Sequence, residues 1–194
     1  MPAAGGDLPT RAFGTAEEWE AWLREHHDSA PGVWITFARK GSGVASVTYM
    51  EALHAALCFG WIDGQARGLD EASYRQRFTP RRARSIWSKR NREFATALIE
   101  SGRMQPAGLR EVERAKADGR WDAAYDAPST ATVPDDLRAA LDASPDAAAF
   151  FETLNAQNRY AILHRIQTAK RPETRARRIA TFVAMLAAGE TLHP

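Results

Sequence analysis

The chain contains 194 residues, of which 44% are hydrophobic and 26% are charged, and its formal net charge at pH 7 is +2. These values exclude an intrinsically disordered chain, and the single cysteine excludes an intramolecular disulfide. The length suits one domain or two small subdomains that bury about 70% of the unfolded chain's surface. Residues 1–10 show no signal peptide, and no apolar run reaches the ~20 residues of a membrane helix. We therefore expect a cytoplasmic protein without membrane insertion.

The first elements are predicted from helix caps and hydrophobic spacing. Residues 1–12, which contain glycine and proline, are predicted to form a flexible tail. Thr15 and Glu18 form a capping box, and the helix that follows turns Trp19 to the core. The run VWITFA at residues 33–38 predicts a strand.

A second capping box and a hairpin follow along the chain. The capping box at residues 48–51 starts a second helix. Residues 62–69 and 73–79 have strand composition and are separated by a turn at Asp70, so they predict a β-hairpin. With the first strand they make a small, mostly antiparallel sheet. We therefore predict an α+β subdomain over residues 13–90.

The second half of the chain has a different composition. No glycine occurs between Arg120 and Ala188, and alanine is frequent there. Three helices are predicted to start where proline precedes an acid, because proline lacks the amide that is unpaired there and the acid meets the positive end of the helix dipole. These prolines are Pro134, Pro145 and Pro172. We predict that residues 91–194 are all helical and pack on the first subdomain as one compact unit.

A basic and aromatic stretch at residues 74–91 (YRQRFTPRRARSIWSKRN) contains seven cations and no acid. Arginine binds phosphate or carboxylate in a bidentate manner, and serine hydroxyls near a helix start add donors. The candidate anion-binding residues are Arg77, Arg81, Arg82, Arg84, Ser85, Ser88, Lys89 and Arg90. Trp87 is a candidate for stacking on a base or sugar, although the sequence favours a place in the core for it. The alternative for the cations is a solvated basic loop, and both interpretations stay open.

A second candidate site lies in the first strand of the hairpin. If this strand begins at Ile62 and alternates regularly, Asp63, Gln65 and Arg67 share one face while Ile62 points to the core. In one interpretation these three side chains line a pocket beside the basic stretch. The sequence favours the simpler interpretation, an exposed sheet face with an ordinary ion pair.

Signals for catalysis, metals and cofactors are weak. Cys58 lies in an apolar run, which is typical of a small buried side chain and not of a nucleophile. The histidines lack the spacing of a zinc site, so no metal is predicted. No dinucleotide-binding, phosphate-binding-loop or serine-hydrolase motif occurs, so no cofactor is predicted and no catalytic residue is assigned. The basic face of the last helix, residues 170–178, is interpreted as solvated.

Six stretches of the chain carry a family resemblance. They are GVWITFARKGSG (residues 32–43), TYMEALHAALCFGWIDG (48–64), RFTPRRARSIWSKRN (77–91), GRMQPAGLREVERAKADGRW (102–121), PDDLRAALDA (134–143) and AKRPETRARRI (169–179). Together they resemble the YdeI/OmpD-associated family of bacterial proteins, also described as bacteriocin-protection proteins. The resemblance implies a part in stress response and tolerance of bacteriocins or antimicrobial peptides, and it implies no catalytic residues.

Three kinds of function are compatible with these observations. The first is a non-enzymatic stress-related protein that binds an anionic ligand through the basic stretch. The second is an enzyme on a phosphorylated or carboxylated small molecule, with Asp63 as acid or base and Arg81 and Arg82 holding the anion. The third is a nucleic-acid-binding protein or a scaffold whose helical half meets a partner protein or a second copy. A deep pocket joining Asp63 to the arginines favours the enzyme, a flat basic face with exposed Trp87 favours nucleic acid, and an exposed apolar stripe on the helices favours the scaffold.

Overall fold

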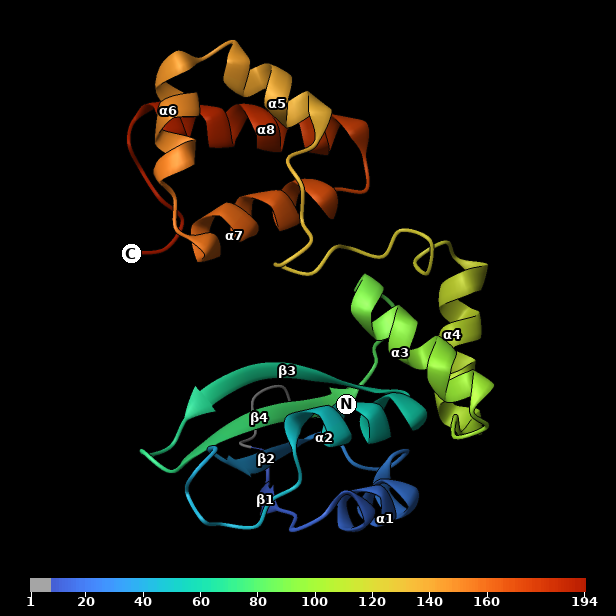
Figure 1. Ribbon diagram of the computed structural model, residues 1–194. Helices are drawn as coiled ribbons and strands as arrows, with labels where there is room; N and C mark the ends of the chain where they lie inside the picture. Colours follow the sequence, from blue (N-terminus) through green and yellow to red (C-terminus); the bar gives the residue numbers. More distant parts are fainter. Residues whose placement is uncertain (1–7) are drawn as a thin grey trace. The chain divides into compact units, whose positions relative to one another are not determined.

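The structure, a computed structural model, describes residues 8–194, so most of the predicted flexible tail, residues 1–7, lies outside the described residues. The chain combines a four-stranded sheet with helices, which confirms the predicted α+β class. It divides into two compact units (Figure 1). Unit 1 comprises the chain up to Trp87 and residues 91–123, and unit 2 comprises residues 88–90 and 124–194.

Unit 1 contains the sheet, whose strand order is β1-β2-β4-β3. The strands are β1 (Thr10–Ala12), β2 (Val33–Ala38), β3 (Trp61–Gly68) and β4 (Ser73–Pro80). Strand β1 is parallel to β2, whereas β4 is antiparallel to both β2 and β3, so the predicted sheet and hairpin are confirmed. Strand β1 corrects the predicted tail. Its three residues are exposed and show no hydrophobic alternation, and only their pairing with β2 makes them a strand.

Four helices accompany the sheet: α1 (Ala16–His26), α2 (Tyr49–Cys58), α3 (Lys89–Glu100) and α4 (Pro106–Ala117). The predicted caps are present, because the Thr15 hydroxyl accepts from the Glu18 amide and Thr48 forms a complete capping box with Glu51. Almost all of α3 and the whole of α4 group with the sheet, whereas the sequence places them in the helical half.

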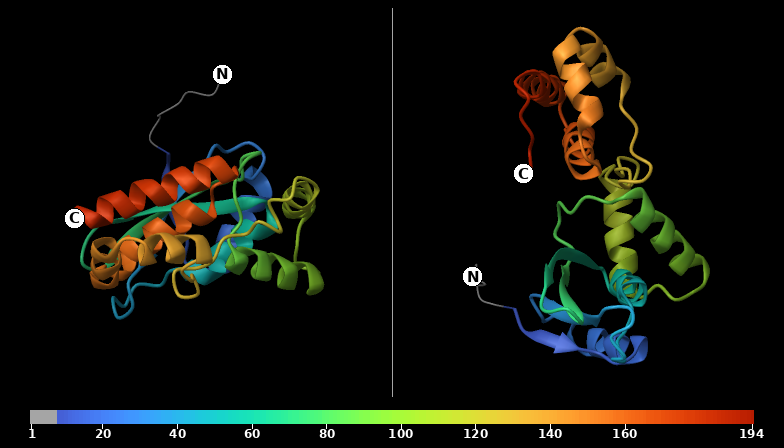
Figure 2. Two further views of the ribbon diagram at one scale, coloured as in Figure 1. Left: turned by 90° about the horizontal axis from the view of Figure 1, so that it is seen from above. Right: turned by 60° about the vertical axis from the view of Figure 1, so that its left-hand side comes forward.

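The core of unit 1 lies between the sheet and helices α1 and α2, which cover the same face of the sheet (Figure 2). Trp19 of α1 and Trp61 of β3 are fully buried and contact each other edge to face at 6.2 Å. The indole of Trp19 also donates a hydrogen bond to the carbonyl of Ala52 in α2 at 3.0 Å. These contacts fix which face of the sheet is covered and which face is left for function.

Unit 2 is helical and has its own hydrophobic core. Its helices are α5 (Asp135–Asp142), α6 (Pro145–Thr153), α7 (Ala156–Gln167) and α8 (Pro172–Ala187). The predicted proline-led starts are confirmed, since Pro145 and Pro172 begin α6 and α8 and Pro134 caps α5. The buried side chains of this core include Leu137, Phe151, Ile162, Ile166, Phe182 and Leu186.

Candidate functional site

The two faces of the sheet differ in chemistry. On β2, Val33, Ile35 and Phe37 are buried under the helices, and the residues between them face the other way. Directly paired residues of antiparallel strands share a face, and Trp34 pairs with Arg77. In unit 1, no helix among residues 8–123 covers this second face, which we call the open face (Figure 2).

Four side chains gather on the open face and form what we call the sheet-face cluster. Its members are Trp34, Arg67, Arg75 and Arg77. The guanidinium carbons of Arg75 and Arg67 lie 4.8 and 5.1 Å from the centroid of the Trp34 ring, which is the geometry of cation–π contacts. The Trp34 side chain is thereby covered and keeps only 5% exposure, while Arg67 and Arg77 remain exposed. The cluster therefore presents guanidinium groups to solvent over an aromatic base.

The cluster is cationic without an acidic counterpart. Within residues 8–194, none of its three arginines has a carboxylate at ion-pair distance. Arg67 and Arg75 lie directly opposite each other on β3 and β4, and like charges so placed destabilise a sheet by a few tenths to about 1 kcal/mol. The buried Nε of Arg75 also has no hydrogen-bond partner. The cluster therefore holds guanidinium donors and like-charge repulsion that no carboxylate among residues 8–194 offsets.

A β-bulge changes the second candidate site. The pairing of β3 with β4 shifts by one residue between Asp63 and Ala66, so β3 contains one extra residue there. The regular alternation on which the prediction rests is therefore interrupted. Asp63 faces the helix-covered side, whereas Arg67 faces the open side. The prediction that Asp63, Gln65 and Arg67 share one face is wrong.

Asp63 is held inside a small polar network on the covered side. Its carboxylate accepts hydrogen bonds from the hydroxyl of Tyr49 at 2.9 Å and from the side-chain amide of Gln76 at 3.3 Å. The predicted orientation of Ile62 is also wrong, since Trp61 is the fully buried residue and Ile62 is only half-buried. The enzyme interpretation places Asp63 beside Arg81 and Arg82, but Arg81 lies buried against Trp87 and Arg82 is exposed in the turn after β4.

Gly64 lies in the bulge and makes room for Arg77. A Cβ atom at Gly64 would lie 3.1 Å from Nε and 3.3 Å from an Nη atom of Arg77, closer than ordinary contact. The guanidinium of Arg77 thus rests on the backbone of β3. The position of the Arg77 guanidinium therefore depends on the absence of a side chain at Gly64.

Two arginines near the end of β4 are buried instead of exposed. Arg81 is 6% and Arg120 is 8% exposed. The guanidinium of Arg81 lies 3.5 Å from the centroid of the Trp87 ring, and Arg120 donates to the carbonyl of Ser85 at 2.7 Å. Trp87 is 2% exposed, so its predicted place in the core is confirmed and its candidate role as a stacking platform is wrong. Arg81 supports this core and is not part of an exposed surface.

The remaining candidates of the basic stretch divide between the two units. Arg82 and Arg84 are exposed in the turn after β4, where the Ser85 hydroxyl accepts a hydrogen bond from the Arg82 amide at 2.9 Å. Three candidates belong to unit 2, namely Ser88, Lys89 and Arg90. Lys89 forms an ion pair with Asp126 at 2.5 Å, and its hydrogen bond lowers the pKa of that carboxyl. The stretch is therefore not a uniform basic loop.

Other chemistry-bearing groups show no catalytic arrangement. Cys58 is buried, and burial raises the pKa of its thiol to about 11, so it is not a thiolate at neutral pH. Among residues 8–194, no three histidine, cysteine or acidic side chains are grouped to hold a metal ion. Of the helices in that range, none is both long and apolar enough to cross a membrane.

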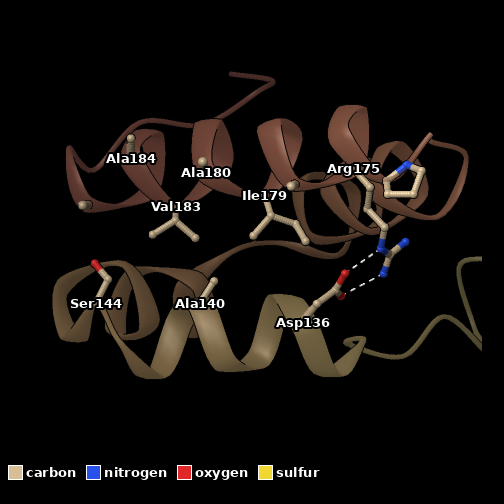
Figure 3. A pocket seen from close by; sticks show the side chains of 11 residues that line it. Asp136, Ala140, Ser144, Arg175, Ile179, Ala180, Val183 and Ala184 are labelled. Carbon is tan, nitrogen blue, oxygen red and sulfur yellow. Dashed lines mark hydrogen bonds and ion pairs between the residues drawn. The ribbon is translucent and has the colours of Figure 1, made fainter. Parts of the chain in front are cut away.

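Unit 2 contains an apolar groove of about 680 Å³ between α5 and α8 (Figure 3). The groove exists because its walls carry small side chains, with Ile179 and Val183 at its base. The wall residues include Ala140, Ala176, Ala180, Ala184 and Ala187. This groove is the exposed apolar stripe that favours the scaffold interpretation, which therefore keeps a physical basis in unit 2.

An ion pair closes one end of the groove. Arg175 donates two hydrogen bonds to Asp136, at 2.6 and 2.8 Å, and a third to the carbonyl of Ile166 at 3.0 Å (Figure 3). The hydrogen bond from Arg175 lowers the pKa of Asp136 below its ordinary value of 3.8. The basic face of α8 is therefore only partly solvated, and its central arginine links two helices.

Two family models match the chain, one on each unit. Residues 11–111 match a domain of unknown function (DUF8412), which is just over half of the chain, and residues 130–189 match the model described as bacteriocin-protection, YdeI or OmpD-associated. The chain belongs to the DUF8412 family and carries a YdeI/OmpD-associated domain. The resemblance stated from the sequence is thereby confirmed. Searches of curated proteins and of solved structures gave no match.

The matched regions divide the two surfaces between them. The DUF8412 region contains the whole sheet-face cluster, and the YdeI/OmpD-associated domain contains α5 to α8 and their groove. Sequence reasoning named Arg67 and Arg77 but missed Trp34 as their partner. The signal was present in β2, where Trp34 and Thr36 alternate with three apolar residues and so point away from the core.

Proposed function

We propose that this protein is a non-enzymatic cytoplasmic member of its family that binds an anionic ligand on the open face of the sheet. The observation that carries the proposal is the sheet-face cluster, in which Arg67 and Arg75 oppose each other over Trp34. Among the described residues, no carboxylate lies at ion-pair distance from either arginine. Each charge-assisted hydrogen bond to a bound anion contributes about 1.5–3 kcal/mol. Binding thus more than offsets the electrostatic repulsion between Arg67 and Arg75.

The chemistry of the cluster points to phosphate or carboxylate as the bound group. A guanidinium offers five N–H donors in a planar fork that matches these anions, and it keeps its charge at every physiological pH. Trp34 holds two of the guanidinium groups in place, which reduces the side-chain entropy lost on binding. The description of the matched domain supports a part in stress tolerance, with the bound anion as an intracellular component.

The test is a titration with sodium pyrophosphate followed by tryptophan fluorescence. All six tryptophans lie in unit 1, so the signal reports that unit, and Trp34 contacts the proposed ligand donors directly. We expect saturable binding that weakens at least about tenfold in Arg75→Ala, since one charge-assisted contact is lost. The control is Arg177→Ala, which removes the same charge from an exposed position on α8. Equal affinity in the wild type and Arg75→Ala would sink the proposal.

A further inference from the structure

The cluster offers its charges as a row and not as a single pocket. Arg75 and Arg77 are two residues apart on β4 and share one face, so their Cα atoms lie about 6.7 Å apart. Arg67 lies beside Arg75 on the next strand. Further along the chain, the turn after β4 adds the exposed Arg82 and Arg84. A ligand with several anionic groups in succession therefore matches this row of arginines better than one small anion does.

The rest of the open face is suited to a sugar–phosphate backbone. Thr36 pairs with Arg75, Thr79 follows Arg77 on the same face, and Thr10 pairs with Trp34. Their hydroxyls donate and accept hydrogen bonds, as protein contacts to phosphate and sugar commonly do. None of the open-face positions in the four described strands carries an acid.

Two of the acids near the cluster in sequence, Asp63 and Asp70, accept hydrogen bonds from other groups. Asp63 faces the covered side of the sheet. Asp70 accepts from the amide of Ala72 and the hydroxyl of Ser73 in the hairpin turn, and these hydrogen bonds lower its pKa. Neither carboxylate lies at ion-pair distance from an arginine of the cluster.

Two guanidinium groups lying over an indole also favour unpaired bases. The guanidinium groups of Arg67 and Arg75 lie over Trp34, and planar arginine groups stack on the bases of single strands. Trp34 itself is covered, so the arginines and not the indole meet the ligand. Bases paired in a duplex do not offer this contact, because their faces are taken by their neighbours.

From this arrangement, and resting on the proposed function, we infer that the open face binds single-stranded nucleic acid. The arginines contact successive phosphates and stack on bases, and the threonines contact the backbone. Contacts to phosphates and stacking on bases carry little sequence information, so binding should depend little on sequence.

The test is fluorescence anisotropy with labelled single-stranded DNA and RNA of about 15 nucleotides, the matching duplex, and increasing salt. We expect the single strands to bind more tightly than the duplex. The variant Arg67→Ala/Arg75→Ala/Arg77→Ala should lower the affinity at least about tenfold and reduce the salt slope by about 2, or 0.7 for each lost phosphate contact. A control that removes the same charge from unit 2, Arg138→Ala/Arg171→Ala/Arg177→Ala, should stay within about twofold of the wild type.

A second variant separates planar stacking from charge. Arg67→Lys/Arg75→Lys keeps both charges and the fold but removes the planar groups, so it should lose the preference for single strands while its salt slope is retained. Equal weakening by the two triple variants, or a duplex that binds as tightly as the single strand, would overturn the inference. Binding of pyrophosphate without binding of oligonucleotides would also overturn it and would leave the proposed function standing. Failure of both ligands would remove both.

Discussion

The arginines of the sheet-face cluster in unit 1 and the arginines that link helices in unit 2 are held in opposite ways. In unit 2, Arg175 is joined to Asp136 and Arg159 to Glu152, each by two hydrogen bonds. In unit 1, the arginines of the sheet-face cluster face an indole ring and one another. An arginine paired with a carboxylate between two helices contributes to the fold. Arginines set directly opposite each other add repulsion instead, which supports the proposal that they bind a ligand.

The largest effect on stability is expected from the ion pair between Arg175 of α8 and Asp136 of α5. Arg175→Ala removes the link between α5 and α8 and the hydrogen bond to Ile166, and it should lower the stability of unit 2 by about 1 kcal/mol, a value reduced by the partial exposure of the pair. Hydrogen–deuterium exchange of α5 and α8 peptides measures this. Affinity for pyrophosphate should stay unchanged. Arg177→Ala on the same helix is the control, and equal exchange in both variants would contradict the pairing.

The pair of Arg175 and Asp136 also predicts that the stability of unit 2 depends on pH. The folded-state pKa of Asp136 is lowered, so its stabilisation is present above its ordinary pKa of 3.8 and is lost as the pH falls through the lower folded value. Asp136→Asn should therefore increase exchange in α5 at pH 7 and match the wild type at the acid end. A difference that persists at low pH would show that Asp136 acts by another route.

A smaller effect on stability is expected in the sheet-face cluster. Arg67→Ala removes a cation–π contact and a like-charge repulsion, each worth about 0.5 kcal/mol and opposite in sign. The free energy of unfolding of unit 1, followed by tryptophan fluorescence in urea, should change by less than about 0.5 kcal/mol, while the affinity for pyrophosphate falls about tenfold. A loss of stability as large as that of Arg175→Ala would show that Arg67 stabilises the fold as much as the ion-paired Arg175 does.

The smallest expected effect comes from the bulge. Gly64→Ala pushes only the flexible end of Arg77, so stability should change by less than about 0.5 kcal/mol. The displaced guanidinium should weaken pyrophosphate binding by about two- to threefold, which the fluorescence titration resolves. Combining Gly64→Ala with Arg77→Ala should produce no further weakening beyond Arg77→Ala alone. Additive losses would mean that Gly64 acts independently of Arg77.

Much of the fold follows from local sequence rules. The capping boxes, the hairpin and the proline-led helices were predictable because each depends on a few neighbouring residues. Strand β1 was not predictable in this way, since its residues are exposed and become a strand only through pairing with β2. The grouping of α3 and α4 with the sheet likewise depends on contacts between residues distant in sequence.

The candidate site was predictable in composition but not in geometry. The basic stretch marked Arg77, yet a one-residue bulge in β3 reversed the side to which Arg67 points relative to Asp63. Whether an arginine is buried on an indole, as Arg81 is, or exposed above one, as Arg67 is, depends on packing that spacing alone does not encode.

The most direct test compares unfolding of unit 1 in the wild type and in Arg67→Ala/Arg75→Ala, each with and without pyrophosphate. Ligand that binds only the folded state adds stability in proportion to the logarithm of its concentration above Kd. We predict that without ligand the variant is about as stable as the wild type, and that pyrophosphate raises the urea midpoint of the wild type alone. A variant less stable by more than about 1 kcal/mol, with no ligand effect in the wild type, would contradict the account by showing that these arginines serve the fold.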